Sequence, residues 1–294
     1  MKNKKDLPRG CITAIVTPFT ESGIDYEALF GLIDFQINEG VSGIVLLGTT
    51  GESPTVREEE RNELITLTKE RIGGRVPLIV GTGSNNTELS KKHTYDAEKF
   101  GADGILAVTP YYNKASIAGL IQHYKEIASV TSLPIILYNV PSRTGLDMGT
   151  PTLEGLYGTE NVVAVKEASG NVLRAERILN AFGDRYAIYS GCDELTLPIL
   201  SIGGKGVISA VSNVVPREIS TLCREFFDGN VKKSAEIQLR LYDLIDEMFA
   251  EVNPIPVKTA LSVMGKCADT FRLPLCRSTR RDKIKACLEK YGLI

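Results

Sequence analysis

Eight short apolar segments recur along the chain, and amphipathic stretches separate them. The segments lie at 12–17, 43–48, 78–81, 104–109, 134–139, 162–167, 186–190 and 206–210. Runs of this length, rich in Val, Ile and Leu, are typical of parallel strands buried on both faces. The stretches between them, such as 26–38 and 57–71, space their apolar residues as helices do. Eight strand–helix repeats predict an α/β fold, the (β/α)8 TIM barrel, with a doubly wound sheet as the alternative.

The pattern changes after about residue 230. From there to the end the sequence favours helices only, at 231–250, 256–265 and 280–291. No linker-like or low-complexity stretch separates this region from the preceding one. We therefore expect residues 1–230 to form the barrel with the active site. Residues 231–294 are then a C-terminal helical appendage packed on the barrel.

The charge balance excludes several classes of function. The 294 residues include 34 Lys and Arg and 36 Asp and Glu, for a net charge of −2. A chain so nearly neutral offers no basic field for nucleic acid. No apolar run reaches the ~20 residues that a membrane-spanning helix needs. We expect a cytoplasmic protein that binds neither nucleic acid nor a membrane.

Cysteine and histidine give little support for a metal site. The six cysteines are scattered without a CxxC pair, so we expect them to be reduced and structural. The two histidines, His93 and His123, fall in separate helical segments and are expected at the surface. They cannot supply the usual three protein ligands of a catalytic zinc. We expect no metal and no cofactor, so that any carbonyl chemistry would proceed through a covalent bond to the protein.

One lysine stands near the C-terminal end of the sixth apolar segment. Burial disfavours the charged form of an ammonium group, and a lysine that is partly neutral near pH 7 can form a Schiff base with a ketone. In a TIM barrel the active site lies at the C-terminal ends of the strands. Lys166 is therefore the candidate nucleophile. The alternative is that the strand ends before Lys166 and the side chain points into solvent.

Polar groups follow other segments at the same end. The loop 48–53, Gly-Thr-Thr-Gly-Glu-Ser, presents Thr49 and Thr50 and could hold a carboxylate, although it could also be only a helix cap. Tyr138 ends the fifth segment and could shuttle protons or simply edge the core. Arg143 could bind a carboxylate through its planar fork or be a solvated surface group.

The seventh segment ends in a glycine that would let a ligand approach the backbone. Gly191 is followed by Cys192, which we interpret as structural because no histidine is available to activate it. Taken together, a lysine, tyrosines, threonines and an arginine converge by topology. This set predicts a site for an acid substrate that carries a ketone.

Three of these segments, in this order, resemble the signatures of a known family. Residues 48–53, residues 138–145 (Tyr-Asn-Val-Pro-Ser-Arg-Thr-Gly) and residues 166–168 (Lys-Glu-Ala) are similar to motifs of the pyruvate-dependent class I aldolases. This family includes dihydrodipicolinate synthase and N-acetylneuraminate lyase. The similarity runs from about Gly10 to the C-terminus.

The resemblance implies a role for each catalytic group. Lys166 would form the Schiff base with pyruvate, and Tyr138 would act as general acid and base. Thr49 and Tyr112 would complete a proton relay with Tyr138. In the family the second tyrosine comes from a neighbouring subunit, so Tyr112 would act across a dimer interface. The implied assembly is a homotetramer built as a dimer of dimers, or a homodimer.

The resemblance also implies the substrates. Thr50, Gly191 and Ile208 would line the pyruvate end, and Arg143 would bind the carboxylate of the second substrate. An arginine at this position is typical of the synthase branch, which condenses pyruvate with L-aspartate 4-semialdehyde on the diaminopimelate route to lysine. The alternative is a pyruvate-releasing aldolase acting on a 2-oxo-3-deoxy sugar acid or 4-hydroxy-2-oxoglutarate. A third interpretation is a non-catalytic protein that binds a 2-oxo acid.

Feedback inhibition is a further point on which the sequence differs from part of the family. Lysine-inhibited members often bind lysine in a pocket at the dimer interface, with two histidines and a glutamate among its residues. Those three positions appear here as Glu58, Arg61 and Leu89. The pocket positions that match are Ser53, Asn85 and Tyr111. We therefore expect weak or absent inhibition by lysine.

Overall fold

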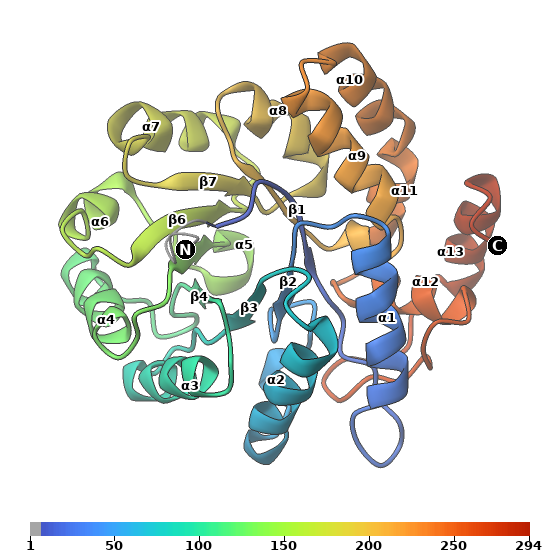
Figure 1. The fold of residues 1–294 in the computed structure, drawn as a ribbon, viewed down its shortest axis with the longest axis horizontal. Helices are drawn as coiled ribbons and strands as arrows, with labels where there is room; N and C mark the ends of the chain where they lie inside the picture. Colours follow the sequence, from blue (N-terminus) through green and yellow to red (C-terminus); the bar gives the residue numbers. More distant parts are fainter. Residues whose placement is uncertain (1–6) are drawn as a thin grey trace.

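The computed structural model describes residues 7–294. Within this part of the chain, eight parallel strands follow one another around a closed barrel, and β8 pairs with β1. The strands are β1 (Gly10–Ala14), β2 (Gly43–Leu46), β3 (Leu78–Gly81), β4 (Gly104–Val108), β5 (Ile135–Asn139), β6 (Val162–Glu167), β7 (Ala187–Ser190) and β8 (Gly206–Ser209). Figure 1 shows the helices arranged around this barrel. The TIM barrel is confirmed, and the doubly wound sheet is excluded because the sheet is closed.

Helices connect the strands and cover the barrel. Those between β1 and the end of the barrel are α1 (Tyr26–Asn38), α2 (Glu58–Ile72), α3 (Thr87–Lys99), α4 (Ile117–Ser129), α5 (Pro141–Thr144), α6 (Thr150–Gly155), α7 (Val172–Phe182), α8 (Thr196–Ser201) and α9 (Pro216–Phe227). Short 3-10 helices are η1 (Ser53–Thr55), η2 (Asp193–Leu195) and η3 (Val211–Asn213). The predicted helix at 26–38 is α1, and the one at 57–71 is α2, shifted by one residue.

The first strand begins and ends earlier than predicted. The sequence favoured 12–17, whereas β1 spans Gly10–Ala14. Beyond Ala14 the N–H of Ile15 still donates to the carbonyl of Val45, at 3.0 Å. The N–H of Val16 instead donates to the side chain of Asn213, at 3.1 Å. The chain therefore leaves the sheet here although its residues remain apolar and buried.

Both faces of the strands are buried, which explains their continuous apolar sequences. One set of side chains packs inside the barrel, and the alternating set packs against the helices. The interior set includes Ile12, Val45, Ile136, Ala164 and Ile208. Since side chains alternate along a strand, the residue two positions after Ala164 also faces the interior. That residue is Lys166.

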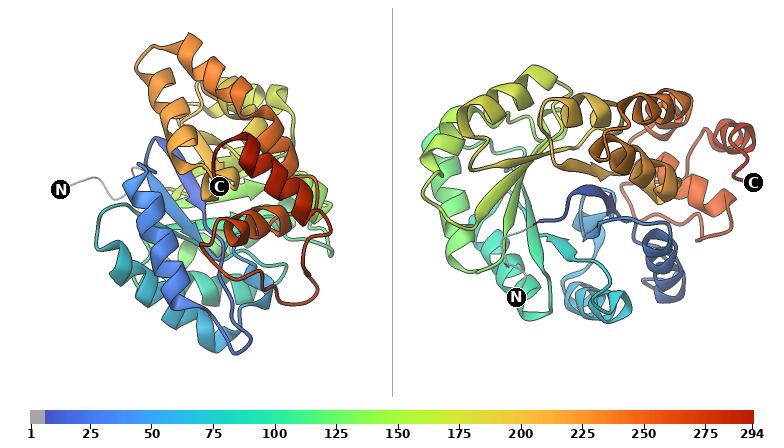
Figure 2. Two further views of the ribbon diagram at one scale, coloured as in Figure 1. Left: turned by 90° about the vertical axis from the view of Figure 1, so that its right-hand side faces the viewer. Right: turned by 45° about the horizontal axis from the view of Figure 1, so that its top comes forward.

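The C-terminal region consists of α10 (Val231–Arg240), α11 (Tyr242–Met248), α12 (Ile255–Val263) and α13 (Arg281–Lys290). The single helix predicted at 231–250 is divided at Leu241. Figure 2 shows these helices gathered on one side of the barrel, near α1 and α9. The helical appendage is therefore confirmed, while a domain boundary at residue 230 stays a prediction. Nowhere in residues 7–294 is a helix both long and apolar enough to cross a membrane.

One of the two histidines lies in the interior, contrary to the sequence prediction. The side chain of His123 in α4 is buried, and its Nδ1 atom lies 2.9 Å from the hydroxyl oxygen of Thr87. Burial lowers the pKa of His123 to about 4. The prediction was wrong here because α4 packs against α3 on the face that carries His123.

Candidate active site

Lys166 and Tyr138 are neighbours across two adjacent strands. They are paired in register between β6 and β5, so both side chains reach the barrel interior at the same level. The Nζ atom of Lys166 lies 4.3 Å from the centre of the Tyr138 ring. Each residue is only 7% exposed. The structure thus has Lys166 inside the barrel and not in solvent, with the Tyr138 side chain beside it.

Gly191 leaves room for the lysine side chain. It follows β7, and a Cβ atom there would lie 3.0 Å from Cε of Lys166 and 2.6 Å from Cβ of Ala168. Both distances are too short for an ordinary contact, so any other residue would displace the lysine. Ile208 of β8 lies in the same interior cluster as Tyr138. Gly191 therefore lies against the lysine and Ile208 lies in the barrel interior, while their role in lining the pyruvate end stays a prediction.

The loop after β2 brings two threonine hydroxyls to the same end of the barrel. It is tightly folded, because the N–H groups of Gly51 and Glu52 donate to the carbonyls of Gly48 and Thr49, both at 3.1 Å. The Thr17 hydroxyl donates to the carbonyl of Gly51, at 2.7 Å. These bonds fix the backbone of the loop and hence the position of its hydroxyls.

A cavity of about 400 Å³ opens beside these groups. Thr49, Tyr138 and Arg143 are among the residues that line it. Arg143 lies in α5, a single turn that directly follows β5, and its Nη2 atom donates to the main-chain carbonyl of Asn253, at 3.2 Å. Arg143 is exposed, so its other N–H groups are free to meet a carboxylate entering the cavity.

The cavity continues outward into the region where lysine-inhibited relatives were expected to hold lysine. Here it is lined by Ser53, Glu58, Arg61, Leu89 and His93. Arg61 is 5% exposed, and its guanidinium donates to the Ser53 hydroxyl and to the carbonyl of Gly81, at 3.3 and 3.1 Å. Burial raises the pKa of Glu58, but hydrogen bonds from Lys92 and His93 outweigh it and lower this pKa to about 2. Arg61 is thus a buried cation in the wall of the cavity.

Tyr112 lies apart from the other site residues within the single chain. It is 89% exposed, and its backbone adopts the left-handed conformation with φ of 72°. Its N–H donates to the carbonyl of Thr144, at 3.4 Å, so the loop is anchored near α5 although the ring extends into solvent. The structure does not bring Tyr112 together with Tyr138 in one subunit.

Cys192 does not have the properties of a nucleophile. Burial, with a smaller effect from nearby carboxylates, raises the pKa of its thiol to about 12. The thiolate, which is the reactive form, is therefore scarce at neutral pH. This agrees with the structural role expected from the sequence.

The C-terminal region contributes residues that the sequence analysis missed. Asn253 donates from Nδ2 to the Thr50 hydroxyl oxygen, at 3.0 Å. The Nζ atom of Lys258 lies 2.7 Å from Oε1 of Glu52, and both side chains are completely buried. The only sequence signal was that Lys258 interrupts an apolar stretch, as Lys166 does. Lys258 is paired with a carboxylate and closed off from solvent, so it is not an alternative nucleophile.

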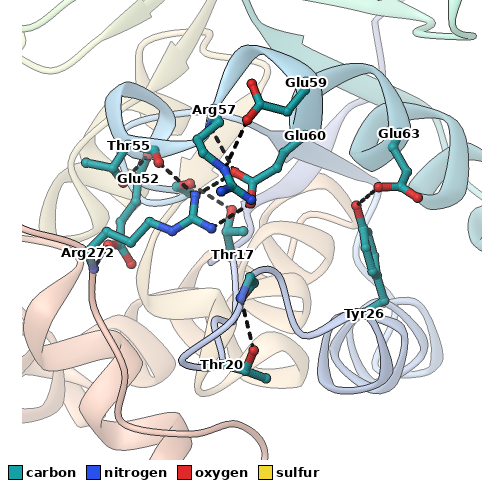
Figure 3. A network of polar contacts seen from close by, with 12 residues as sticks. Thr17, Thr20, Tyr26, Glu52, Thr55, Arg57, Glu59, Glu60, Glu63 and Arg272 are labelled. Carbon is teal, nitrogen blue, oxygen red and sulfur yellow. Dashed lines mark hydrogen bonds and ion pairs between the residues drawn. The ribbon is translucent and has the colours of Figure 1, made fainter.

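A further network fixes the chain that follows the threonine loop. Figure 3 shows Arg272 reaching across to the segment between Glu52 and Glu60. Its two Nη atoms each donate to a carboxylate oxygen of Glu60, at 2.6 Å, and Nη1 also donates to the carbonyl of Thr55, at 2.8 Å. The Arg57 guanidinium donates to the same Glu60 carboxylate, at 2.8 Å. The C-terminal region is thus tied to the β2–α2 connection by charged hydrogen bonds.

Comparisons with known proteins show the family of this chain. Residues 7–290 match the model of the dihydrodipicolinate synthetase family. A 4-hydroxy-tetrahydrodipicolinate synthase of Alkaliphilus oremlandii is 47% identical over 97% of this chain and 99% of its own length. The corresponding protein of Acetivibrio thermocellus is 45% identical over 99% and 100%. The crystal structure of dihydrodipicolinate synthase from Aquifex aeolicus superimposes with a TM-score of 0.95 at 43% identity, covering 97% of this chain and 98% of that one. The chain belongs to the dihydrodipicolinate synthetase family.

Proposed function

We propose that this protein is a lyase of the 4-hydroxy-tetrahydrodipicolinate synthase type, which condenses pyruvate with L-aspartate 4-semialdehyde. The observation that carries the proposal is the position of the Lys166 amine, 4.3 Å from the Tyr138 ring and beside a cavity that Thr49 and Arg143 line. An amine, an acid–base group and a carboxylate-binding cation are the three requirements of this reaction. The names of the relatives support the same assignment.

The covalent steps of the proposed reaction begin at the Lys166 amine. Nζ of Lys166 attacks the ketone carbon of pyruvate, and loss of water from the carbinolamine gives an imine. The imine withdraws electrons from the adjacent methyl group, which loses a proton to form an enamine nucleophile. The enamine carbon then attacks the aldehyde carbon of the second substrate. Tyr138 accepts and returns the protons of these steps, with Thr49 and a partner subunit's copy of Tyr112 completing the relay.

The remaining residues bind and orient the substrates. Thr50 would donate its hydroxyl proton to the carboxylate of pyruvate, while Gly191 and Ile208 border the space for its methyl and keto groups. Arg143 would bind the carboxylate of the semialdehyde. The route uses no cofactor and no metal, because the lysine imine itself supplies the electron sink.

Arg143 also favours this reaction over cleavage of a sugar acid. A 2-oxo-3-deoxy sugar acid presents neutral hydroxyls where the semialdehyde presents a second carboxylate. A guanidinium at the mouth of the cavity matches the charged group and not the hydroxyls.

The exposed ring of Tyr112 supports an assembly in which two copies meet at this loop. We propose a homodimer or a homotetramer built as a dimer of dimers, located in the cytoplasm. An 89% exposed tyrosine on a backbone anchored near α5 is suited to reach a neighbouring copy.

The test has two readouts. The purified protein should consume pyruvate and L-aspartate 4-semialdehyde when coupled to the next reductase, with loss of NADPH. Borohydride with pyruvate should trap a covalent adduct, and Lys166→Ala should abolish the adduct. Lys205→Ala, at the opposite end of the barrel before β8, is the matched control and should keep the adduct. A folded protein that does not condense the two substrates, but releases pyruvate from 2-oxo-3-deoxy sugar acids, would support the alternative of a pyruvate-releasing aldolase.

A further inference from the structure

Asn253 contacts both groups that are expected to bind substrate carboxylates. Its Nδ2 atom donates to the Thr50 hydroxyl oxygen, at 3.0 Å, and its main-chain carbonyl accepts from Nη2 of Arg143, at 3.2 Å. The residue is 7% exposed and lies just before α12, outside the strands that supply the catalytic groups. We propose that Asn253 is a positioning residue whose side chain directs the Thr50 hydroxyl toward pyruvate. This inference rests on the function proposed above.

The contact with Thr50 sets the direction of a hydrogen bond. An amide nitrogen can only donate, so the Thr50 oxygen accepts from Asn253. The single proton of the hydroxyl is then available for another acceptor. A carboxylate can only accept, which makes it the matching partner. Asn253 therefore keeps Thr50 as a donor toward the pyruvate carboxylate.

The contact with Arg143 limits a mobile side chain. Arginine loses rotamer entropy when its side chain is fixed in one conformation. Here one N–H is already used on the Asn253 carbonyl, and the remaining donors stay available. The Arg143 side chain is thus partly ordered before the substrate binds, so binding orders it at a smaller loss of entropy. One residue of the C-terminal region consequently touches the binding groups for both carboxylates.

The surrounding structure holds Asn253 in place. The N–H of Lys258 donates to the carbonyl of Pro254, at 2.9 Å, which joins the segment to α12. Lys258 in turn pairs with Glu52 in the same loop as Thr50, and Arg272 holds Glu60 just beyond it (Figure 3). The C-terminal region is therefore fixed relative to the loop that it orients.

A double-mutant cycle tests whether Asn253 acts through Thr50. Asn253→Ala, Thr50→Val and the double variant are compared for the KM of each substrate, kcat and Tm. Asn253→Ala should raise the KM for pyruvate about tenfold, as loss of one oriented hydrogen bond does. In the Thr50→Val background the same change should add almost nothing, because its target is gone. Asn230→Ala is the matched control, since it removes one amide hydrogen bond, to Glu225 at 2.9 Å, far from the site; its KM values should be unchanged.

The Asn253→Asp variant tests whether the direction of the hydrogen bond to Thr50 matters or only the size of the side chain. A carboxylate at this position keeps the size of Asn but accepts the proton of Thr50, so Thr50 no longer donates to pyruvate. We expect its KM for pyruvate to exceed that of Asn253→Ala. The same substitution in the Thr50→Val background measures the effect of charge repulsion alone. A purely structural role predicts the reverse order, because the isosteric variant would be the milder one.

The outcomes are distinct. Additive effects of Asn253→Ala and Thr50→Val, or a milder Asn253→Asp variant, would overturn the inference while leaving the proposed function intact. A wild-type protein that does not condense the two substrates would overturn the proposed function and this inference with it. Non-additive effects with the expected order of variants would support it.

Discussion

The Nζ atom of Lys258 lies 2.7 Å from Oε1 of Glu52, and neither side chain has any exposed surface. Burial lowers the pKa of Lys258, and Glu52 acts in the opposite direction. The ring of Phe19 adds a cation–π contact, with its centre 4.2 Å from Nζ. The pair joins α12 to the loop that carries Thr49 and Thr50. The position of this loop therefore depends on both members of the buried ion pair.

Lys258→Met should therefore destabilise the protein strongly. Removing one partner leaves Glu52 buried and unpaired, which costs on the order of 3–5 kcal/mol in the free energy of unfolding. The double variant Lys258→Met with Glu52→Gln should recover part of the loss, since no charge remains buried. Denaturant unfolding measures both effects. Lys285→Met is the control, because its partner Glu289 is exposed and 3.9 Å away, and little change is expected. If Lys258→Met were as stable as wild type, the ion pair would not contribute to stability as proposed here.

Tyr138→Phe should separate imine formation from turnover. The phenyl ring preserves the packing beside Lys166, but it has no proton to exchange. We expect borohydride trapping with pyruvate to persist, only more slowly, while kcat falls by about 10²- to 10⁴-fold. Trapping followed by mass measurement and steady-state kinetics give the two readouts. Turnover close to wild type would exclude Tyr138 as the proton shuttle.

Arg143→Ala should affect one substrate more than the other. Its side chain lines the cavity, where we propose that it binds the semialdehyde carboxylate. Loss of a charged hydrogen bond costs about 1.5–3 kcal/mol, which corresponds to a rise of roughly 10- to 100-fold in KM for the semialdehyde. The KM for pyruvate should change much less. Equal changes for both substrates would instead indicate a structural role through the contact with Asn253.

Local sequence patterns predicted the parts of the candidate site that strands position. Lys166, Tyr138 and Gly191 stand at or just after strand ends, and parallel strands bring their C-terminal ends to one face of the barrel. The order of the strands follows from chain order alone. These features could be predicted because each depends on a few adjacent residues and on the topology of the fold.

The contributions of the C-terminal region could not be predicted in this way. Asn253 and Thr50 are 203 residues apart, and Lys258 and Glu52 are 206 apart. Nothing in either local pattern specifies such a partner, since a polar residue before a helix and a lysine within one are both common at surfaces. The expected partner of Tyr112 lies in another subunit, so no feature of the single chain positions it.

Lysine should inhibit the enzyme weakly or not at all. The outer cavity is lined by Arg61, whose buried guanidinium would repel the ammonium groups of lysine. Glu58 is already engaged by Lys92 and His93, at 2.8 and 2.7 Å, and is not free to bind a further cation. Initial rates measured at increasing lysine concentration provide the test. Inhibition in the low micromolar range would contradict this prediction.

Glu60 should make part of the stability depend on pH in acid. Hydrogen bonds from Arg272, with further bonds from Arg57, lower the pKa of Glu60 to about 2 from the model-compound value of 4.5. A carboxyl whose pKa is lowered on folding contributes stability above its unfolded pKa, and that stability is lost as the pH falls from about 4.5 to about 2. The shift corresponds to a contribution on the order of 3 kcal/mol to the free energy of unfolding at neutral pH.

Glu60→Gln should therefore be less stable than wild type at pH 7, and the difference should shrink steadily below pH 4.5. Glu63→Gln is the control. Glu63 is an exposed residue of the same helix as Glu60 and accepts a hydrogen bond from Tyr26, and its variant should keep the wild-type dependence of stability on pH. A difference between Glu60→Gln and wild type that stayed constant from pH 7 to pH 2 would show that the contribution of Glu60 does not depend on its charge.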